Sequence, residues 1–232
     1  MKVLAIDTSN YTLGLALMEE DLVIGEYITT VKKNHSIRVM PAIDMLLKDC
    51  DAKPADLSKI VVALGPGSYT GVRIGMTIAK TLAWSLNIPI AGVSSLAFLA
   101  ASGRNFDGLI CPLFDARRGQ VYTGLYEFRD GELAEIQEDC NVMLVDWVES
   151  LKEMDKPVLF VGNDVPLHRE KISEILGGKA HFAGVTQNNP RPSELALMGM
   201  HAEPADVHTI VPNYVRLAEA EAKWLEAQKA KE

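Results

Sequence analysis

The residues best suited to binding chemistry lie in a glycine-rich run, residues 65–71, with the sequence GPGSYTG. An apolar segment, residues 60–64, precedes the run and a long helical pattern follows it, so the sequence predicts a strand, a tight turn and a helix. This arrangement aims backbone N–H groups and a helix N-terminus at an anion. The candidate anion-binding residues of this region are Gly65, Gly67, Thr70 and Arg73.

Two common phosphate-binding motifs are nevertheless absent from this run. A Walker A loop ends in Gly-Lys-Ser/Thr, whereas Gly71 is followed by Val72 and Arg73. A dinucleotide fingerprint needs a third glycine three residues after the second, but Thr70 stands at that distance from Gly67. The loop has no lysine for the β- and γ-phosphates, so we expect weak or absent ATP binding. Arg73 is suited equally to an anion and to a carboxylate of the same chain.

The helix after the loop carries a ridge of small residues. Gly71, Gly75, Ala79 and Ala83 recur every four positions and therefore share one face. A glycine inside a helix costs about 1 kcal/mol relative to alanine, so something must approach the helix closely at Gly75. Two interpretations stay open: the ridge packs on the chain's own sheet or neighbouring helix, or it contacts another protein.

Composition limits the function classes. The chain has 232 residues, of which 48% are hydrophobic and 23% charged, and its net charge is −8. Because phosphate neutralisation supplies much of the affinity for nucleic acids, this charge argues against binding nucleic acid alone. The three cysteines form no Cys-x-x-Cys pair, no apolar run reaches membrane-spanning length, and the N-terminus lacks the features of a signal peptide. We therefore expect a cytoplasmic protein without a membrane partner.

The predicted elements fall into two similar series. The first has strands at residues 3–6, 13–18, 22–28, 60–64 and 90–93, and helices at 36–50, from 71 onward, and from 94 or 95 to 101. The second has strands at residues 109–114, 120–128, 132–138, 157–161 and 181–183, and helices at 145–154, 165–176 and 193–201. A further helix is predicted at residues 217–229, docked by Trp224 and Leu225.

Both series follow the order βββαβαβα, which predicts a duplicated α/β fold with halves at residues 1–103 and 104–232. This order describes the actin, sugar-kinase and Hsp70-like fold (ASKHA, ribonuclease H-like), in which the turn after the first strand of each half faces nucleotide phosphates. Here those turns hold Asp7-Thr8-Ser9 and Asp115. Asp7 and Ser9 therefore join the candidate nucleotide or anion site. Asp7 either faces a metal ion or phosphate, or caps its own turn.

Six segments together resemble one family. They are 5–9 (AIDTS), 35–36 (HS), 65–75 (GPGSYTGVRIG), 92–95 (GVSS), 115–119 (DARRG) and 212–216 (PNYVR). This set resembles the TsaB family, also called YeaZ, of bacterial tRNA threonylcarbamoyladenosine (t6A) biosynthesis. The resemblance implies a partner of TsaD, the subunit that transfers the threonylcarbamoyl group to adenosine 37 of tRNAs reading ANN codons, with TsaE, an ATPase, joining the complex. It also implies contact with tRNA only through the complex.

The residues support a non-catalytic role within that resemblance. TsaD-like subunits hold a metal ion with a His-x-x-x-His pair on the helix after a strand that ends in Gly-Val. In this chain Ser95 and Leu99 occupy those two positions, and its five histidines form no pair at i and i+4. We therefore expect no metal site, no cofactor in this chain and no catalytic residue of its own.

The resemblance also implies an interaction surface, because in relatives two helices pair with the equivalent helices of the partner. The same patch is expected to form homodimers when the partner is absent. The predicted interface residues are Ile37, Met40, Ile43, Leu47, Gly71, Ile74, Gly75, Ile78, Ala79 and Leu82.

Two enzymatic alternatives remain. An ATP-dependent small-molecule kinase of the same fold would need phosphate loops in both halves and a catalytic aspartate, and the second half offers only Gly162-Asn163-Asp164. A metallopeptidase would need the missing histidine pair.

Overall fold

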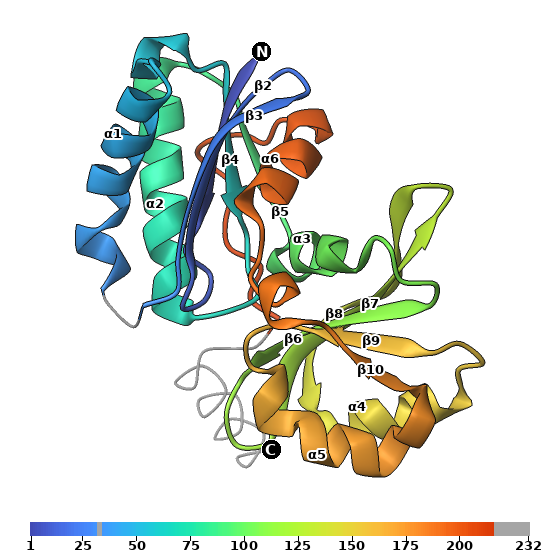
Figure 1. Ribbon diagram of the computed structural model, residues 1–232. Coiled ribbons are helices and arrows are strands. Elements are labelled where there is room, and N and C mark those ends of the chain that lie inside the picture. The colour runs from blue at the N-terminus through green and yellow to red at the C-terminus, as the bar shows by residue number, and fades with distance from the viewer. Residues whose placement is uncertain (32–33, 216–232) are drawn as a thin grey trace, which may run out of the picture.

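The computed structural model describes residues 1–31 and 34–215, which form two five-stranded mixed sheets with helices on their faces (Figure 1). The first sheet has the strand order β3-β2-β1-β4-β5 and the second has the order β10-β9-β6-β7-β8. Within each sheet the first three strands in sequence are antiparallel neighbours, and the last two add in parallel to the first strand. The two sheets therefore have the same topology.

The first sheet is apolar on both sides. Its strands are β1 Lys2–Asp7, β2 Leu13–Glu19, β3 Leu22–Thr29, β4 Lys59–Ala63 and β5 Ile90–Val93. Helices α1 (Val39–Asp49) and α2 (Tyr69–Leu86) cover one face, and α3 (Ser95–Ala100) and α6 (Pro192–His201) lie on the other (Figure 1). Continuous burial on both faces is typical of a sheet with parallel strands between helix layers.

The second sheet repeats this arrangement with different covering helices. Its strands are β6 Leu109–Asp115, β7 Gln120–Arg129, β8 Glu132–Met143, β9 Val158–Val161 and β10 Ala180–Phe182. Helices α4 (Leu144–Ser150) and α5 (Val165–Leu176) pack on one face, and α3 from the first series packs on the other. Helix α3 therefore joins the two sheets.

The predicted duplicated order is confirmed, but the last part of the chain returns to the first sheet. Helix α6 packs against β1, β2 and β4. Lys59 Nζ donates to the carbonyl oxygens of Met200 (3.1 Å) and Ala202 (2.6 Å) at the end of α6. Lys80 Nζ donates in the same way to the carbonyl oxygens of His208 and Ile210, so a lysine on β4 and another on α2 hold the returning segment.

Several element boundaries differ from the prediction. The first helix begins with a 3₁₀ turn at His35–Ile37, and α1 proper starts at Val39, with Pro41 in its first turn, where proline is tolerated. Helix α2 starts at Tyr69, because Ser68 Oγ accepts from the Gly71 N–H at 3.3 Å and caps the helix. Strand β8 extends to Met143, five residues beyond its predicted end.

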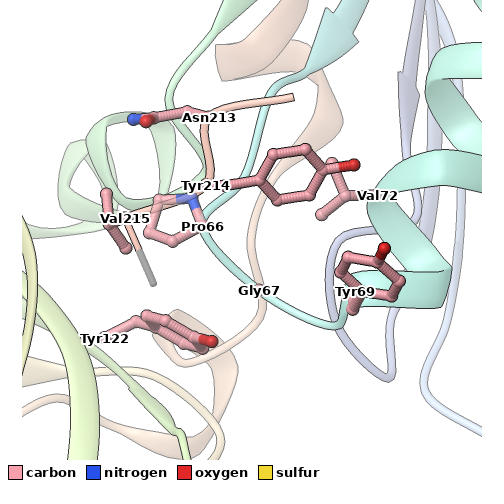
Figure 2. A pocket seen from close by; sticks show the side chains of 8 residues that line it. All are labelled: Pro66, Gly67, Tyr69, Val72, Tyr122, Asn213, Tyr214 and Val215. Carbon is pink, nitrogen blue, oxygen red and sulfur yellow. The ribbon is translucent and has the colours of Figure 1, made fainter. Parts of the chain in front are cut away.

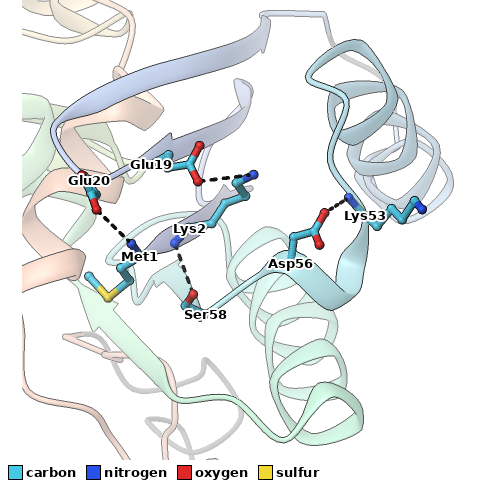
Figure 3. A network of polar contacts seen from close by, with 7 residues as sticks. All are labelled: Met1, Lys2, Glu19, Glu20, Lys53, Asp56 and Ser58. Carbon is cyan, nitrogen blue, oxygen red and sulfur yellow. Dashed lines mark hydrogen bonds and ion pairs between the residues drawn. The ribbon is translucent and has the colours of Figure 1, made fainter.

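Polar contacts hold the N-terminus at the start of β1 in place (Figure 3). The Lys2 N–H donates to Ser58 Oγ at 3.3 Å, and Lys2 Nζ pairs with Glu19 at 3.6 Å. The N-terminal amine lies 4.0 Å from Glu20.

None of the described helices is long and apolar enough to cross a membrane. The predicted helix at residues 217–229 lies outside the described residues.

Candidate functional site

The glycine loop of the first half packs directly on the turn between β1 and β2. An added Cβ on Gly67 would lie 2.1 Å from the Ser9 carbonyl oxygen, a distance that side chains do not tolerate. The Ser68 N–H donates to that same oxygen at 2.7 Å. Glycine at position 67 therefore lets two backbone segments touch, and the loop is held against the chain itself.

The other N–H groups that the sequence suggested for an anion also have partners inside the chain. The Gly65 N–H donates to Ser95 Oγ at 3.1 Å, and the Gly71 N–H to Ser68 Oγ. Together with the Ser68 N–H, three donors of the loop are engaged by protein oxygens. The predicted phosphate cradle around Gly65 and Gly67 is therefore filled by the chain's own groups.

The ridge of small residues on α2 faces the same turn. An added Cβ on Gly71 would lie 2.2 Å from the Thr8 carbonyl oxygen, and one on Gly75 would lie 2.5 Å from Thr8 Oγ1. Thr8 Oγ1 donates to the Gly71 carbonyl oxygen at 2.7 Å, so strand end and helix are hydrogen-bonded where they touch. Of the two interpretations left open by the sequence, packing on the chain's own sheet is correct.

This packing corrects half of the predicted interface. Five of its residues are buried in the chain's own core and cannot present side chains to a partner: Ile43, Leu47, Gly71, Gly75 and Ala79. The other five are exposed or half-buried on the two helices: Ile37, Met40, Ile74, Ile78 and Leu82. The assignment of the interface to these two helices stays a prediction, but the small-residue ridge belongs to the chain's own core.

Asp7 caps its own turn, which was one of its two predicted roles. Its side chain is 1% exposed, and Oδ1 accepts from the Ser9 N–H at 2.8 Å and from Ser9 Oγ at 2.7 Å. Burial raises the pKa of this carboxyl to about 6, although the Ser9 bonds and the nearby His35 act in the opposite direction. Oδ2 has no partner.

Four further buried polar atoms without a partner lie on residues of the same region: Asn10 Nδ2, Thr12 Oγ1, His35 Nδ1 and Arg38 Nη1. The Nε2–H of His35 donates to the Asn10 carbonyl oxygen at 2.8 Å, because a carbonyl can only accept. His35 therefore attaches the 3₁₀ turn to the β1–β2 turn. Enclosed donors and acceptors of this kind are the usual partners of buried water.

Arg73 lies in the first turns of α2 and is exposed, whereas Asp7 is buried. Its guanidinium carbon is 3.9 Å from the centre of the Tyr69 ring, and Nε donates to the Tyr214 hydroxyl at 2.7 Å. Thr70 is exposed beside it. The structure therefore separates the predicted anion site into a buried group, Asp7 and Ser9, and an exposed group, Thr70 and Arg73.

A pocket lies next to the exposed group, between the glycine loop, the start of α2, strand β7 and the end of the described chain (Figure 2). Its empty space, about 310 Å³, includes open solvent, so it is a shallow hollow and not an enclosed cavity. Its lining residues are Pro66, Gly67, Tyr69, Val72, Tyr122, Asn213, Tyr214 and Val215. Among the described residues the lining offers three tyrosine rings, one side-chain amide and apolar groups, so it is suited to binding a ligand by stacking and hydrogen bonds.

The corresponding turn of the second half is built differently. Here the Asp115 N–H donates to a side chain, Asp164 Oδ2, at 2.9 Å, and Asp115 Oδ1 lies 3.2 Å from His168 Nε2. Arg117 and Arg118 both have positive φ angles, 65° and 55°, and are exposed at the tip of this turn.

The two positions at which the resemblance led us to look for a metal-binding histidine pair are interior. Ser95 and Leu99 are both fully buried, and Ser95 Oγ is used by the Gly65 N–H. Within residues 1–31 and 34–215, no three His, Cys, Asp or Glu side chains are grouped so that they could hold a metal ion.

One polar cluster between the halves was not predicted from the sequence. Ser94 caps α3, accepting from the Leu96 and Ala97 N–H groups, and its hydroxyl also donates to Asp139 Oδ2 on β8. Tyr126 donates to the other oxygen of Asp139 at 2.5 Å. Burial raises the pKa values of both Asp139 and Tyr126. The residues lie 13 to 45 positions apart, so no local pattern announces the contact.

Comparison with known proteins gives consistent results. A family model described as TsaD, tRNA N6-adenosine threonylcarbamoyltransferase, matches residues 23–224. The chain is 66% identical over 229 residues to the tRNA threonylcarbamoyladenosine biosynthesis protein TsaB of Bacillus subtilis, covering 99% of this chain and all of that protein.

Two solved structures from Pseudomonas aeruginosa have the same fold. YeaZ superposes with a TM-score of 0.76 at 24% identity, covering 92% of this chain and 99% of its own. A protein described as similar to the peptidase YeaZ superposes with a TM-score of 0.77 at 25% identity, covering 93% and 99%. Sequence and fold thus agree, and the chain belongs to the TsaB (YeaZ) family.

Proposed function

We propose that this chain is a non-catalytic partner subunit in the formation of N6-threonylcarbamoyladenosine at position 37 of tRNAs that read ANN codons. The observation that carries the proposal is the 66% identity, over 99% of the chain, to the TsaB protein of Bacillus subtilis, whose name states this biosynthesis. In this proposal the chain acts in the cytoplasm, binds and activates TsaD, and works with TsaE in one complex.

The interior of the first half supports a role without catalysis. The loop N–H groups that would bind phosphate are engaged by Ser9, Ser68 and Ser95. The two positions that would carry metal-binding histidines hold a buried serine and a buried leucine. A chain built this way contributes a surface, and its partner contributes the reacting groups.

The surface that we assign to TsaD lies on the 3₁₀ turn, α1 and α2, which stand side by side on the outside of the first sheet (Figure 1). We call it the helical face; it consists of the exposed Ile37, Met40 and Met45 and the half-buried Ile74, Ile78 and Leu82. Large exposed apolar groups of this kind mark interaction sites. A specific interface buries about 800 Å² on each partner, which two helices of this length can supply.

We propose that the same face forms a homodimer when TsaD is absent, because an isologous contact requires only self-complementarity.

Reconstitution tests the activity. The purified chain alone should neither phosphorylate sugars with ATP nor cleave protein, which separates the proposal from a kinase and from a metallopeptidase. Added to TsaD, TsaE, ATP and threonylcarbamoyl-adenylate, it should stimulate modification of tRNA. Modification at the same rate without this chain would overturn the proposal.

A matched pair of variants tests the surface. Ile37 and Leu167 are both 71% exposed, the first on the helical face and the second on α5 of the other half. Ile37→Asp should weaken binding to TsaD about tenfold or more, as expected for a charge in an apolar interface, and should shift the homodimer to monomer. Leu167→Asp should change neither. Equal affinities for the two variants would exclude the helical face.

Elemental analysis tests the prediction on metals and cofactors. We expect no stoichiometric zinc or iron in the purified chain, because Ser95 and Leu99 replace the ligand pair. About one tightly held ion per chain would contradict this and would reopen the catalytic alternatives.

A further inference from the structure

We propose that Tyr69, Arg73 and Tyr214 form a platform for one nucleotide unit of single-stranded RNA, with a base stacked on a tyrosine ring and a phosphate at the Arg73 guanidinium. This inference rests on the proposed function, because it gives the chain a contact of its own with the RNA substrate. The residues come from distant parts of the chain: Tyr69 and Arg73 from the first turns of α2, and Tyr214 from the segment that returns after α6.

The three side chains already form a cluster in which the guanidinium lies over one tyrosine ring and beside the other. The Arg73 guanidinium lies 3.9 Å from the Tyr69 ring centre and 5.6 Å from the Tyr214 ring centre, and the two ring centres are 5.6 Å apart. The bond from Nε to the Tyr214 hydroxyl, at 2.7 Å, fixes the plane of the guanidinium. Aromatic rings interleaved with arginine are the common means of holding unpaired bases.

The charge at this place suits a phosphate. Among the described residues, Arg73 forms no ion pair with a carboxylate, and only its Nε donates a hydrogen bond. The adjacent N–H groups of Tyr69 and Thr70 belong to the first two residues of an 18-residue helix and therefore have no partner within it. A free guanidinium beside a helix N-terminus is a favourable position for a phosphate.

The openness of the platform favours RNA over a free nucleotide. Tyr69 is 49% exposed and Tyr214 is 43% exposed, and the pocket between them and Tyr122 is shallow (Figure 2). A small ligand usually needs a site that buries most of its surface, whereas a nucleotide in a strand is also held by its neighbours. The chain's net charge of −8 opposes RNA elsewhere on its surface, so the affinity should depend strongly on this one arginine.

The test measures fluorescence anisotropy of a fluorescein-labelled 12-nucleotide oligo(A) RNA at low salt, with the full chain alone and in complex with TsaD. Arg73→Ala should weaken binding about tenfold, the size expected for the loss of one stacked cation. Tyr69→Leu should weaken it to a similar extent, whereas Tyr69→Phe keeps the ring and should bind as the parent does. Tyr214→Phe keeps the ring but loses the oxygen that orients Arg73, so its effect should be intermediate.

Lys171→Ala is the matched control, because it also removes one exposed positive charge, on α5 of the other half. It should leave the anisotropy curve unchanged. Equal losses for Arg73→Ala and Lys171→Ala, or no RNA binding in either the free chain or the complex, would overturn the platform. Competition by AMP as effective as by the same concentration of RNA nucleotides would assign the site to a free nucleotide and overturn the RNA proposal.

The outcome is separable from the proposed function. TsaD binding is measured with the same Arg73→Ala and Tyr69→Leu variants, whose substituted side chains lie outside the helical face. If these variants bind TsaD normally but lose RNA, both proposals stand. If the parent chain binds TsaD and no variant affects RNA, only the platform is wrong; if the parent fails to bind TsaD, the proposed function fails first.

Discussion

The turns that follow the first strand of each sheet occupy the same place in the same topology, yet they are built in opposite ways. In the first half, Asp7, Thr8 and Ser9 are buried beneath a glycine loop and a helix, and each makes hydrogen bonds within the chain. In the second half, Asp115 is partly exposed and Arg117 and Arg118 are exposed. A duplicated topology therefore places two equivalent turns without giving them equivalent surroundings.

The difference follows from glycine positions. Gly67, Gly71 and Gly75 allow backbone and helix to approach the first turn within distances that any Cβ would block. The second half has no corresponding run, and an aspartate side chain, Asp164, caps its turn. The same glycine loop that suggests a phosphate site in sequence thus closes that site in the structure. The following predictions separate the closed turn from the open one, from the largest expected effect to the smallest.

The closed turn should not tolerate a methyl group. Gly71→Ala would place Cβ 2.2 Å from the Thr8 carbonyl oxygen, and we expect a loss of about 3 kcal/mol in the free energy of unfolding. In the open turn, Gly119→Ala meets only the flexible end of Met143, at 3.2 Å, and should cost about 1 kcal/mol for its positive φ angle. Urea unfolding measures both. Equal losses would show that the first turn is not tightly closed.

Burial of Asp7 should make the folded protein less stable as pH rises. The folded pKa is about 6 and the ordinary value 3.8, so the folded state binds more protons between these values, and stability should fall as pH rises from about 4 to 6. The loss approaches about 3 kcal/mol by pH 7, at about 1.4 kcal/mol per pKa unit.

Replacing this carboxyl tests its contribution. Asp7→Asn can still accept from Ser9 and should remove the decline, so the variant should be more stable than the parent at pH 7. Asp115→Asn, the counterpart in the open turn, should leave the decline in place because Asp7 is unchanged. Urea unfolding at pH values from 4 to 8 gives the curves, and an unchanged slope in Asp7→Asn would contradict the assignment.

The contact of Ser94 with Asp139 should contribute more to the free energy of unfolding than a helix cap alone. Ser94→Ala removes the cap of α3 and also the donor to the buried Asp139, so we expect a loss of about 2 kcal/mol. Ser68→Ala removes only an exposed cap of α2 and should cost about 1 kcal/mol. Thermal and urea unfolding compare the two; a smaller loss for Ser94→Ala would mean that Asp139 does not depend on it.

The open turn should contribute least. His168→Ala removes a 3.2 Å contact to a partly exposed carboxylate, and such contacts contribute less than about 1 kcal/mol. We expect a decrease in Tm of less than about 3 °C, since about 1 kcal/mol shifts the Tm of a chain of this size by 2–4 °C. A decrease of 10 °C in differential scanning calorimetry would show that the second turn is as constrained as the first.

Much of this molecule is determined by its sequence. Apolar runs and helical periodicity predict the order βββαβαβα in both halves, and of the two serines at which the third helix was expected to start, Ser94 is its cap. The family can likewise be recognised from local motifs, above all the glycine run, because a motif is defined by the order of residues along the chain.

Only the tertiary structure decides which surfaces these elements present. A stripe of small residues predicts close approach but not the neighbour that approaches, and here the neighbour is Thr8, on the turn after β1. Tyr214 reaches Arg73 across 141 residues, and Ser94 reaches Asp139 across 45. Periodicity reports the face that a helix buries, whereas a hydrogen bond between distant residues depends on how the two sheets are placed, which no local pattern contains.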